Sequence, residues 1–303
     1  MRRVARLIGF LTVCLGVLAV IAIGGPLLSL ARQERRRRLF MAGCHRLWAR
    51  TLLWMLNIAV VAEGVTGEAM ATPHLLVSNH LGYLDVLIIG AYYPTTFVAK
   101  SEVAGWPLLG WLARLGGTIF LRRGDTASNV GCVYRVSRRL RDGDHVHLFP
   151  EGTTGDGRAL VPFNPLFFAS AVRAGAPILP LTLQVRQVND SLPYDEACEL
   201  FCWYGDTLFL PHFWNLLRID SARIALIQHE PIGVTRKDRA RSIALRAEGQ
   251  IAESFYSHGQ AGHDTLTGEN EMPVDFIAGA LLFSLVASQR SESVREMIPA
   301  NEE

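Results

Sequence analysis

A histidine and an aspartate five positions apart are the residues in this chain best suited to chemistry. His80 and Asp85 lie in the segment VSNHLGYLD. On a continuous helix a five-residue offset takes two side chains off the same face, but a turn at Gly82 would bring the carboxylate behind the imidazole. One ring N–H would then be held, and the other ring nitrogen could take a proton from a substrate hydroxyl. This is the base half of a catalytic triad without a nucleophile of its own, and a structural histidine is the alternative.

A polar, glycine-rich turn follows one of the expected strands. The strand covers 145–149, and the following turn reads FPEGTTGDG from Phe149 to Gly157. Open α/β sheets bind ligands where their strands end in such turns. The main-chain N–H groups of Gly152 and Thr153 could therefore meet an anionic group or orient a hydroxyl. The alternative is an ordinary connecting turn.

Two adjacent arginines come directly after another expected strand. The segment GGTIFLRR ends in Arg122 and Arg123. Arginine pairs at a strand end suit the recognition of a phosphate or a carboxylate. A pair of solvated surface arginines is the alternative reading.

Other common chemistries have little support in the sequence. No GxSxG segment marks a hydrolase serine, and no GxxxxGK[ST] segment marks a phosphate-binding loop. His145 and His147 share one face of an expected strand, but no third ligand is near them in the sequence, which disfavours a zinc site.

Short apolar runs alternate with helical stretches from about Glu63 onward. Asp125 is placed to cap a helix that runs to Arg141, and Gly143 stands just past its end. The alternation predicts an α/β fold, a layered sheet flanked by helices. The expected strands cover residues 74–78, 95–99, 118–121, 145–149, 178–183 and 223–227.

The charge is concentrated at the N-terminal end of the chain. The whole sequence holds 30 basic and 28 acidic residues, which excludes the global basic excess of a nucleic-acid-binding protein. The first 50 residues, by contrast, carry ten arginines and one acid, Glu34. A basic N-terminal segment followed by a weakly acidic remainder predicts that the chain binds an anionic membrane surface.

An uncharged stretch within this basic segment is long enough to span a bilayer. The stretch covers Leu7 to Ala31, and we expect a transmembrane helix at about 7–31. A cleaved signal peptide is disfavoured by the length of the run and by the arginines behind it. For about 39–62 we expect a second helix that lies in the membrane interface, with its tryptophans at the headgroup level. An ordinary core-facing helix is the alternative for this second segment.

Four ordered blocks resemble the glycerophospholipid acyltransferase family, which includes the 1-acylglycerol-3-phosphate acyltransferases. His80 and Asp85 match its NHxxxxD motif, and the segment 149–153 matches its FPEGT block. The segment 117–123 is similar to its GxIFxxR block, and 176–181 is similar to its proline-bearing apolar block. The resemblance covers roughly residues 70–185 and implies a glycerol-3-phosphate acyltransferase-like fold.

The resemblance implies a role for each matched residue. His80 would be the general base and Asp85 its orienting partner, and the acceptor hydroxyl would attack the acyl thioester directly. Arg123, Glu151 and Gly152 would bind the polar head of the acceptor, joined by Thr153 of the same turn. The acyl donor would be acyl-CoA or acyl carrier protein, and no metal or other cofactor is implied.

The expected acceptor is a lysolipid, above all 1-acyl-sn-glycerol 3-phosphate, which would yield phosphatidic acid. Two departures bear on the headgroup: Thr154 stands where family members acting on this acceptor commonly have arginine, and Arg122 stands where an aspartate is frequent. Segments 149–157, 203–206 and 211–214 look like a bacterial branch with lyso-ornithine lipid acyltransferases, which is the alternative. A catalytically silent lipid-binding membrane protein is the non-enzyme alternative, and the intact His80/Asp85 pair argues against it.

These features divide the chain into three parts. We expect a membrane anchor at 1–62, an acyltransferase domain at 63–256, and a polar acidic tail at 257–303 with a short apolar segment, Phe276–Ala287. The arginine cluster 35–38 favours a location at the inner, cytoplasmic membrane, with the catalytic domain facing the cytoplasm.

Overall fold

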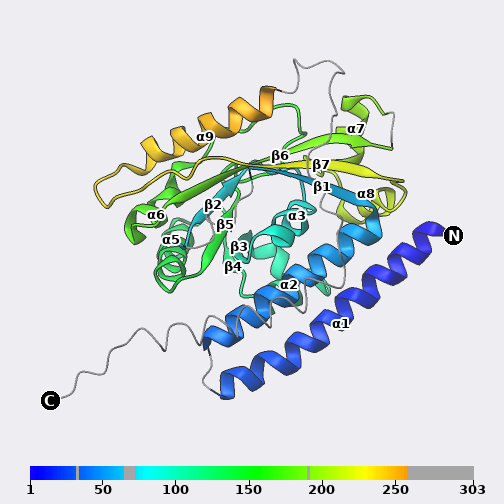
Figure 1. Cartoon of the computed structure of the whole chain (residues 1–303), viewed down its shortest axis with the longest axis horizontal. Helices are drawn as coiled ribbons and strands as arrows, with labels where there is room; N and C mark the ends of the chain where they lie inside the picture. The colour runs from blue at the N-terminus through cyan, green and yellow to red at the C-terminus, as the bar shows by residue number, and fades with distance from the viewer. Residues whose placement is uncertain (32–33, 65–71, 190–191, 258–303) are drawn as a thin grey trace, which may run out of the picture. The chain divides into compact units, whose positions relative to one another are not determined.

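The computed structural model describes residues 1–31, 34–64, 72–189 and 192–257. The expected tail beyond residue 257, with its apolar segment, lies outside this description. Within it, seven strands form one sheet in the order β1-β7-β6-β2-β5-β3-β4 (Figure 1), and neighbours are parallel except for the antiparallel pair β6 and β7. The strands are β1 (Ile58–Glu63), β2 (Leu75–Ser78), β3 (Thr95–Lys100), β4 (Ile119–Leu121), β5 (His145–Leu148), β6 (Ile178–Val188) and β7 (Ala222–Gln228).

Helices cover both faces of this sheet (Figure 1), so the expected α/β layered fold is confirmed. Helices α1, α2 and α3 lie on one side, whereas α5, α6 and α9 lie on the other. The helices are α1 (Arg2–Leu30), α2 (Glu34–Leu56), α3 (Asp85–Tyr92), α4 (Leu109–Leu115), α5 (Thr126–Arg141), α6 (Ala169–Ala174), α7 (Tyr194–Phe201), α8 (Phe209–Leu216) and α9 (Ala240–Ser257), with 3-10 turns η2 (Ser101–Gly105) and η3 (Pro165–Phe168).

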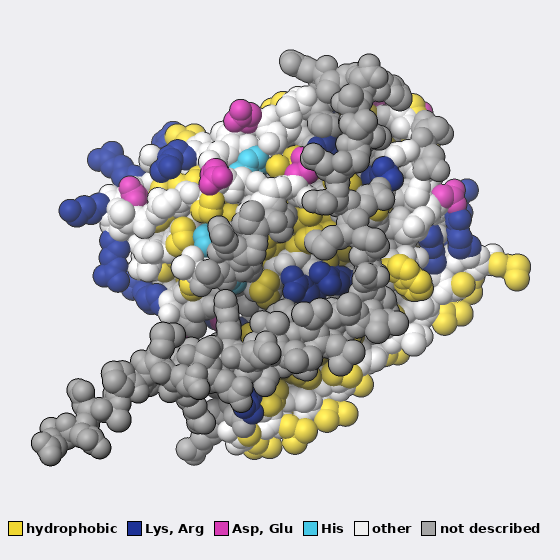
Figure 2. Space-filling model, in the orientation of Figure 1, with side chains coloured by type: hydrophobic (Ala, Val, Ile, Leu, Met, Phe, Trp, Pro, Cys, Tyr) yellow, Lys and Arg dark blue, Asp and Glu magenta, His cyan; other side chains and the backbone are white. Residues whose placement is uncertain are grey.

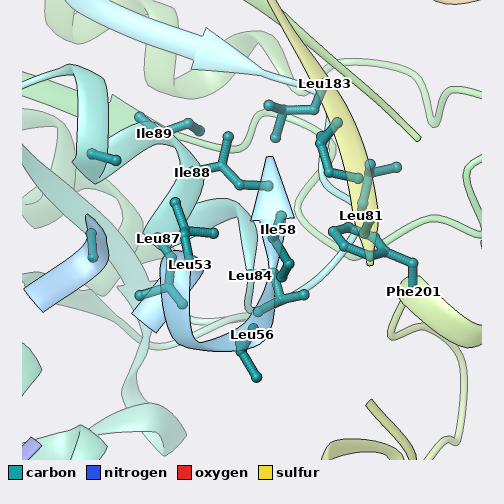
Figure 3. Packing of buried hydrophobic residues seen from close by; sticks show 14 of the residues in the cluster. Leu53, Leu56, Ile58, Leu81, Leu84, Leu87, Ile88, Ile89, Leu183 and Phe201 are labelled. Carbon is teal, nitrogen blue, oxygen red and sulfur yellow. The ribbon is translucent and has the colours of Figure 1, made fainter. Parts of the chain in front are cut away.

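The central strand β2 shows why the sheet needs a helical layer on each face. Successive side chains of a strand point to opposite faces. Leu76 belongs to the core under α2 and α3, whereas Leu75 and Val77 belong to the core under α5, α6 and α9. All three are fully buried, as is typical of parallel strands covered on both sides. Figure 3 shows the first of these two cores.

The expected strands are all present, and the helix expected after Asp125 is present as α5. The Asp125 carboxylate accepts a hydrogen bond from the N–H of Ser128, so it is the N-cap. Gly143 follows the helix end with a φ of 90°, a conformation that glycine adopts without strain.

The second expected helix is shorter than predicted, because its last part is a strand. Helix α2 ends at Leu56, and Asn57 takes a left-handed φ of 57° that breaks the helix. The chain then enters β1, which pairs in parallel with β7 from Ile58 opposite Ala222. The sheet therefore begins before residue 63, and the prediction of a helix through Ala62 was wrong.

The tryptophans of α2 do not share one exposed face as expected. Trp54 is exposed, but Trp48 is buried and its indole N–H donates to the Cys14 sulfur of α1. Leu52 is fully buried as well. Helix α2 therefore packs between α1 and α3 with its inner face in the core. This was the alternative interpretation of the segment.

Two arginines of α2 bind the C-terminal end of α3. The guanidinium of Arg46 donates to the carbonyls of Ala91 and Tyr92, and that of Arg50 donates to the carbonyl of Ala91. Cations at a helix C-terminus satisfy carbonyls that lack partners within the helix. Helix α2 is thereby fixed to α3.

Helix α1 begins at Arg2, earlier than expected, and runs antiparallel to α2 (Figure 1). In the described part of the chain it is the one helix long and apolar enough to cross a bilayer, and little of its apolar surface is buried. These properties indicate membrane association.

Candidate active site

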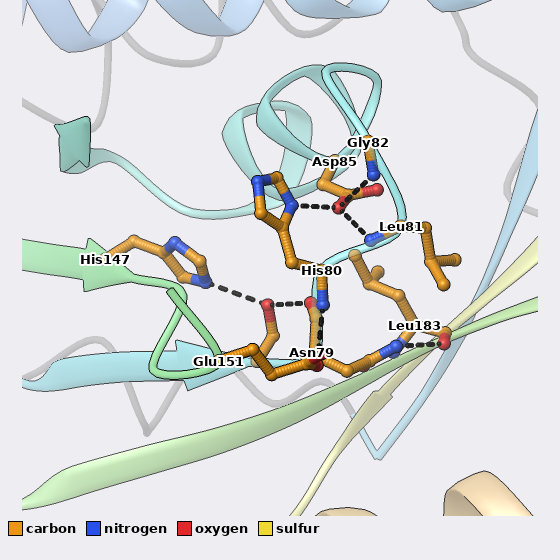
Figure 4. Close-up of polar contacts among 9 residues, drawn as sticks. Asn79, His80, Leu81, Gly82, Asp85, His147, Glu151 and Leu183 are labelled. Atoms are coloured by element: carbon orange, nitrogen blue, oxygen red, sulfur yellow. Dashed lines mark hydrogen bonds and ion pairs between the residues drawn. The ribbon is translucent and has the colours of Figure 1, made fainter. Parts of the chain in front are cut away.

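The two residues expected to form a dyad lie at the end of the central strand (Figure 4). After β2 ends at Ser78, the Asn79 amide exchanges two hydrogen bonds with the main chain of Leu183 in β6, which fixes the point where the chain leaves the sheet. His80 follows, and Asp85 is the first residue of α3. The His80 Nδ1–H donates to Asp85 Oδ2 over 2.7 Å.

The Asp85 carboxylate is fixed in place by the main chain. Its Oδ2 also accepts the N–H groups of Leu81 (2.7 Å) and Gly82 (3.0 Å). Because an ionised carboxylate only accepts hydrogen bonds, the shared proton belongs on His80 Nδ1, and Nε2 is left as a proton acceptor. Asp85 is fully buried, whereas the His80 side chain is 17% exposed and can be reached from outside.

Gly82 lets this turn pack closely against the segment at Trp203. A Cβ atom at this position would lie 3.1 Å from the main-chain nitrogen of Trp203 and 3.2 Å from its Cβ. The Trp203 N–H donates to the carbonyl of Leu81, which holds the segment against the turn. The sequence suggested a role for Gly82 in the turn, and the structure supplies the reason.

An aromatic layer lies behind the His80 ring. The Phe149 ring stacks on the imidazole with centroids 3.6 Å apart, and the His147 ring packs against Phe149 at 4.5 Å. His147 Nε2 bonds to the Ser78 hydroxyl. Burial, and next the nearby His80, lowers the pKa of His147 well below its ordinary value, so His147 is neutral.

Glu151 supports the turn from beneath. Its Oε1 accepts the His80 N–H at 3.0 Å, and its Oε2 accepts the Val161 N–H at 3.3 Å. Burial raises the pKa of Glu151 to about 8, despite these two bonds, which lower it. The carboxyl faces the main chain of the dyad, so its expected contact with an acceptor stays a prediction.

The two other expected residues of this turn lie at its exposed tip. Gly152 has a φ of 68°, and its N–H donates to the Phe149 carbonyl, which closes the turn. That N–H is therefore already engaged, whereas the neighbouring Thr153 is exposed. Gly155 ties the turn to the dyad, because its N–H donates to the His80 carbonyl at 2.7 Å.

Cations follow the next two strands at the same edge of the sheet. Arg123 comes just after β4 and is exposed. Lys100 ends β3, where it pairs with Leu121, and its ammonium lies 5.8 Å from the centre of the Trp203 ring. Because β3 and β4 are neighbouring parallel strands, both cations lie at the same edge of the sheet.

The sheet order places Lys100 nearer to the dyad than Arg123. Strands lie about 4.8 Å apart, so the end of β3 is roughly 10 Å from the end of β2, and the end of β4 is roughly 14 Å from it. The sequence analysis missed Lys100. Its position directly after the expected strand 95–99 was the signal that could have found it.

An apolar cavity of about 370 Å³ lies against the turn that carries the dyad, although neither His80 nor Asp85 is part of its wall. Tyr83 and Leu84, which lie between His80 and Asp85 in the chain, form part of its wall. The rest of the wall comes from several elements, with Phe10 and Ile21 of α1, Leu52 of α2, Phe97 of β3, Leu112 of α4 and Phe213 of α8 among its residues. A space of this kind suits a hydrocarbon chain.

Comparison with known proteins agrees with the resemblance read from the sequence. A family model described as acyltransferase matches residues 60–184. A lyso-ornithine lipid O-acyltransferase of Pseudomonas aeruginosa is 35% identical over 254 residues, which cover 84% of this chain and 92% of the relative. The chain belongs to the acyltransferase family.

Other relatives of this acyltransferase differ in the extent of their match. A lyso-ornithine lipid O-acyltransferase of Rhodobacter capsulatus is 32% identical over 78% of this chain and 86% of its own length. A 1-acyl-sn-glycerol-3-phosphate acyltransferase of Neisseria gonorrhoeae is 36% identical over 110 residues, which cover 36% of this chain and 43% of the relative.

The acyltransferase also shares its fold with a solved structure. The crystal structure of the 1-acyl-sn-glycerophosphate acyltransferase of Thermotoga maritima has a TM-score of 0.61 and 19% sequence identity, and covers 87% of this chain and 100% of its own. At this identity the likeness shows the fold alone.

The described residues of the acyltransferase hold no group of three or more His, Cys, Asp or Glu side chains that could bind a metal ion. The two histidines of β5 have separate partners instead, because His145 Nδ1 accepts the His74 N–H and His147 bonds to Ser78. The chemistry that the site can perform is proton transfer at His80 Nε2.

Proposed function

We propose that this chain transfers a fatty acyl group from a thioester donor to the free hydroxyl of a lyso-ornithine lipid. The observation that carries the proposal is the full-length match to the Pseudomonas aeruginosa relative, which extends over 92% of that protein. Relatives named for 1-acyl-sn-glycerol 3-phosphate match shorter stretches, of 110 to 176 residues. The match to the Pseudomonas aeruginosa relative is long enough to include residues outside the shared motif blocks, such as those of α7 and α8.

The geometry of the dyad supports a direct transfer. His80 Nε2 takes the proton from the acceptor hydroxyl while the hydroxyl oxygen bonds to the thioester carbonyl carbon. The carbon–sulfur bond then breaks, and the imidazolium returns the proton to the departing thiolate. Asp85 stabilises the imidazolium through the bond from Nδ1, as the carboxylate of a triad does. No acyl-enzyme forms in this scheme.

The charges near the site fit an amino-acid headgroup. Ornithine has a carboxyl group and two amino groups, so a lipid linked through one amine keeps a carboxylate and an ammonium. Lys100 and Arg123 supply cations for the carboxylate. Because Thr154 stands in place of an arginine, the FPEGT turn has one cation fewer. A carboxylate carries less negative charge than a phosphate dianion, so it needs this cation less.

The apolar cavity provides a place for an acyl chain. Its wall includes Tyr83 from the turn between His80 and Asp85 and Phe10 from α1, so it lies between that turn and the membrane-associated helix. A chain in this cavity would lie against the turn that carries His80. We therefore place one hydrocarbon chain of the reacting lipids here.

A second candidate acceptor is 1-acyl-sn-glycerol 3-phosphate, the acceptor expected from the sequence. The cations Lys100, Arg122 and Arg123 at one sheet edge favour it, because they suit a phosphate. The shorter match of its named relatives is the reason for ranking it second.

We further propose a membrane location with the catalytic domain in the cytoplasm. Helix α1 supports the membrane part of this proposal. The arginines at 35–38 support the cytoplasmic side, because positively charged flanks stay in the cytoplasm. A thioester donor is also made inside the cell. The division into an anchor, a catalytic domain and a tail is part of the same proposal, with the domain starting at β1.

An acceptor panel tests the proposal. The purified chain is supplied with acyl-CoA or acyl carrier protein as donor, and thiol release is measured with lyso-ornithine lipid and with 1-acyl-sn-glycerol 3-phosphate. We expect kcat/KM to be at least tenfold higher with lyso-ornithine lipid, and His80→Ala to abolish release with both. A preference for the phosphate acceptor would replace the proposal with the second candidate.

A further inference from the structure

Helix α8 has an apolar outer face that the fold leaves uncovered. Its inner face is buried through His212, Phe213 and Leu216. On the outer side Leu210 is 73% exposed, and Leu208 just before the helix is 72% exposed. Leucines exposed to this extent are costly in water, and such a patch marks an interaction surface.

Both sides of α8 contact the first turns of α1, Phe213 on the inner side and Trp214 on the outer side. The ring of Phe10 packs on Phe213 with centroids 4.9 Å apart, and the guanidinium of Arg3 lies 5.6 Å from the centre of the Trp214 ring. The Arg6 guanidinium donates to the carbonyl of Leu217 just after α8. The N-terminal end of α1 and the C-terminal end of α8 are therefore one surface.

The charge and side-chain types of this surface match a bilayer. A shallow recess next to Trp214 is lined by three arginines, Arg2, Arg3 and Arg218, and by one acid, Asp220. Arginines beside a half-exposed tryptophan and exposed leucines are the groups that settle at the boundary of anionic headgroups and acyl chains. Figure 2 shows hydrophobic side chains along the margin where Figure 1 places α1.

The inner face of α8 reaches the catalytic turn. The Tyr83 hydroxyl donates to His212 Nδ1 over 2.9 Å, and the His212 Nε2–H donates to the Cys202 carbonyl. Phe209 and Phe213 of α8 also line the apolar cavity that lies against this turn. Whatever holds the outer face of α8 therefore holds a wall of that cavity.

We propose that α8 is a second membrane-contacting element, which inserts Leu208, Leu210 and Trp214 into an anionic bilayer beside the N-terminal end of α1. The contact keeps the cavity wall formed by Phe209 and Phe213 at the level of the lipids. A lysolipid then enters the site from the bilayer without crossing water. The inference needs membrane association only, and not a particular acceptor.

Fluorescence quenching tests the contact directly. The full chain is bound to phosphatidylglycerol and phosphatidylethanolamine vesicles with or without lipids brominated near the headgroups. The difference between the wild-type signal and that of Trp214→Phe isolates Trp214. We expect brominated lipids to reduce this difference at least twofold. As a matched control, a tryptophan added by Leu245→Trp on the exposed face of α9 should not be quenched.

Kinetics test the consequence. The double variant Leu208→Ser/Leu210→Ser should raise the acceptor KM at least fivefold in vesicles but less than twofold in detergent micelles. Its kcat should be unchanged. The control Leu245→Ser should leave the acceptor KM unchanged in both vesicles and micelles. An unquenched Trp214, or an equal rise in KM in vesicles and micelles, would overturn the proposal. Quenching is read without any acceptor, so a wrong assignment of the substrate leaves this test intact.

Discussion

The Phe149 ring lies flat on the His80 imidazole, with the two planes 10° apart and their centroids separated by 3.6 Å. Asp85 fixes the same imidazole through Nδ1, so the ring is held both at its edge and on one face. A stacked contact of this kind is worth roughly 0.5–1.5 kcal/mol. The base is therefore oriented before any substrate arrives.

Replacement of Phe149 tests this orientation. Phe149→Leu should lower kcat about tenfold with little change in either KM, because the ring of His80 gains freedom while the binding surfaces stay. Phe149→Tyr keeps a flat ring and should restore most of the rate. Steady-state kinetics with both variants decide the matter, and an equal loss in the two would show that the stacking has no special role.

Replacement of Asp85 tests the tautomer of His80. Asp85→Asn should lower kcat by about 10³, since an amide can present an N–H to Nδ1 and move the proton to Nε2. His80→Ala removes the base and should be at least as severe. Circular dichroism controls for folding. A near-normal rate in a folded Asp85→Asn protein would contradict the proposed role of the carboxylate.

Glu151 should make the stability of the protein depend on pH. Burial raises its pKa to about 8 from an ordinary value of 4.5, so the folded chain keeps a proton that the unfolded chain releases. This stabilisation is complete below about pH 4.5 and is lost as the pH rises to about 8. The melting temperature in detergent should therefore fall less between pH 5.5 and 8.5 in Glu151→Gln than in the wild type. Parallel curves for the two proteins would argue against a buried, protonated Glu151.

The two lysines of the chain form a matched pair for testing the acceptor site. Lys100→Ala should raise the acceptor KM roughly tenfold or more and leave the donor KM unchanged, because a charge-assisted hydrogen bond is worth about 1.5–3 kcal/mol. Lys237→Ala removes an exposed lysine before α9 and should have no effect. Arg123→Ala should act on the same KM more weakly, given its greater distance along the sheet. A larger effect at Arg123 than at Lys100 would reverse this order.

Local patterns were enough to predict most of the catalytic turn. The spacing of His80 and Asp85, with Gly82 between them, was enough to predict a turn that brings the two side chains together, and the structure has this contact. The cap at Asp125 and the glycine at 143 act within a few residues as well, so they defined α5 correctly.

Contacts between distant segments decided what the sequence left open. Residues 58–63 are apolar enough for a helix or a strand, and β7, more than 150 residues later in the chain, makes them a strand by pairing with them. Glu151 has the same sequence context whether it faces substrate or protein, and only the packing of the turn directs its carboxyl to the N–H of His80. The sequence alone thus predicted the candidate catalytic groups, through short-range spacing and the resemblance to a family. The tertiary structure decided which side chains surround them, because burial and strand order arise only when remote parts of the chain come together.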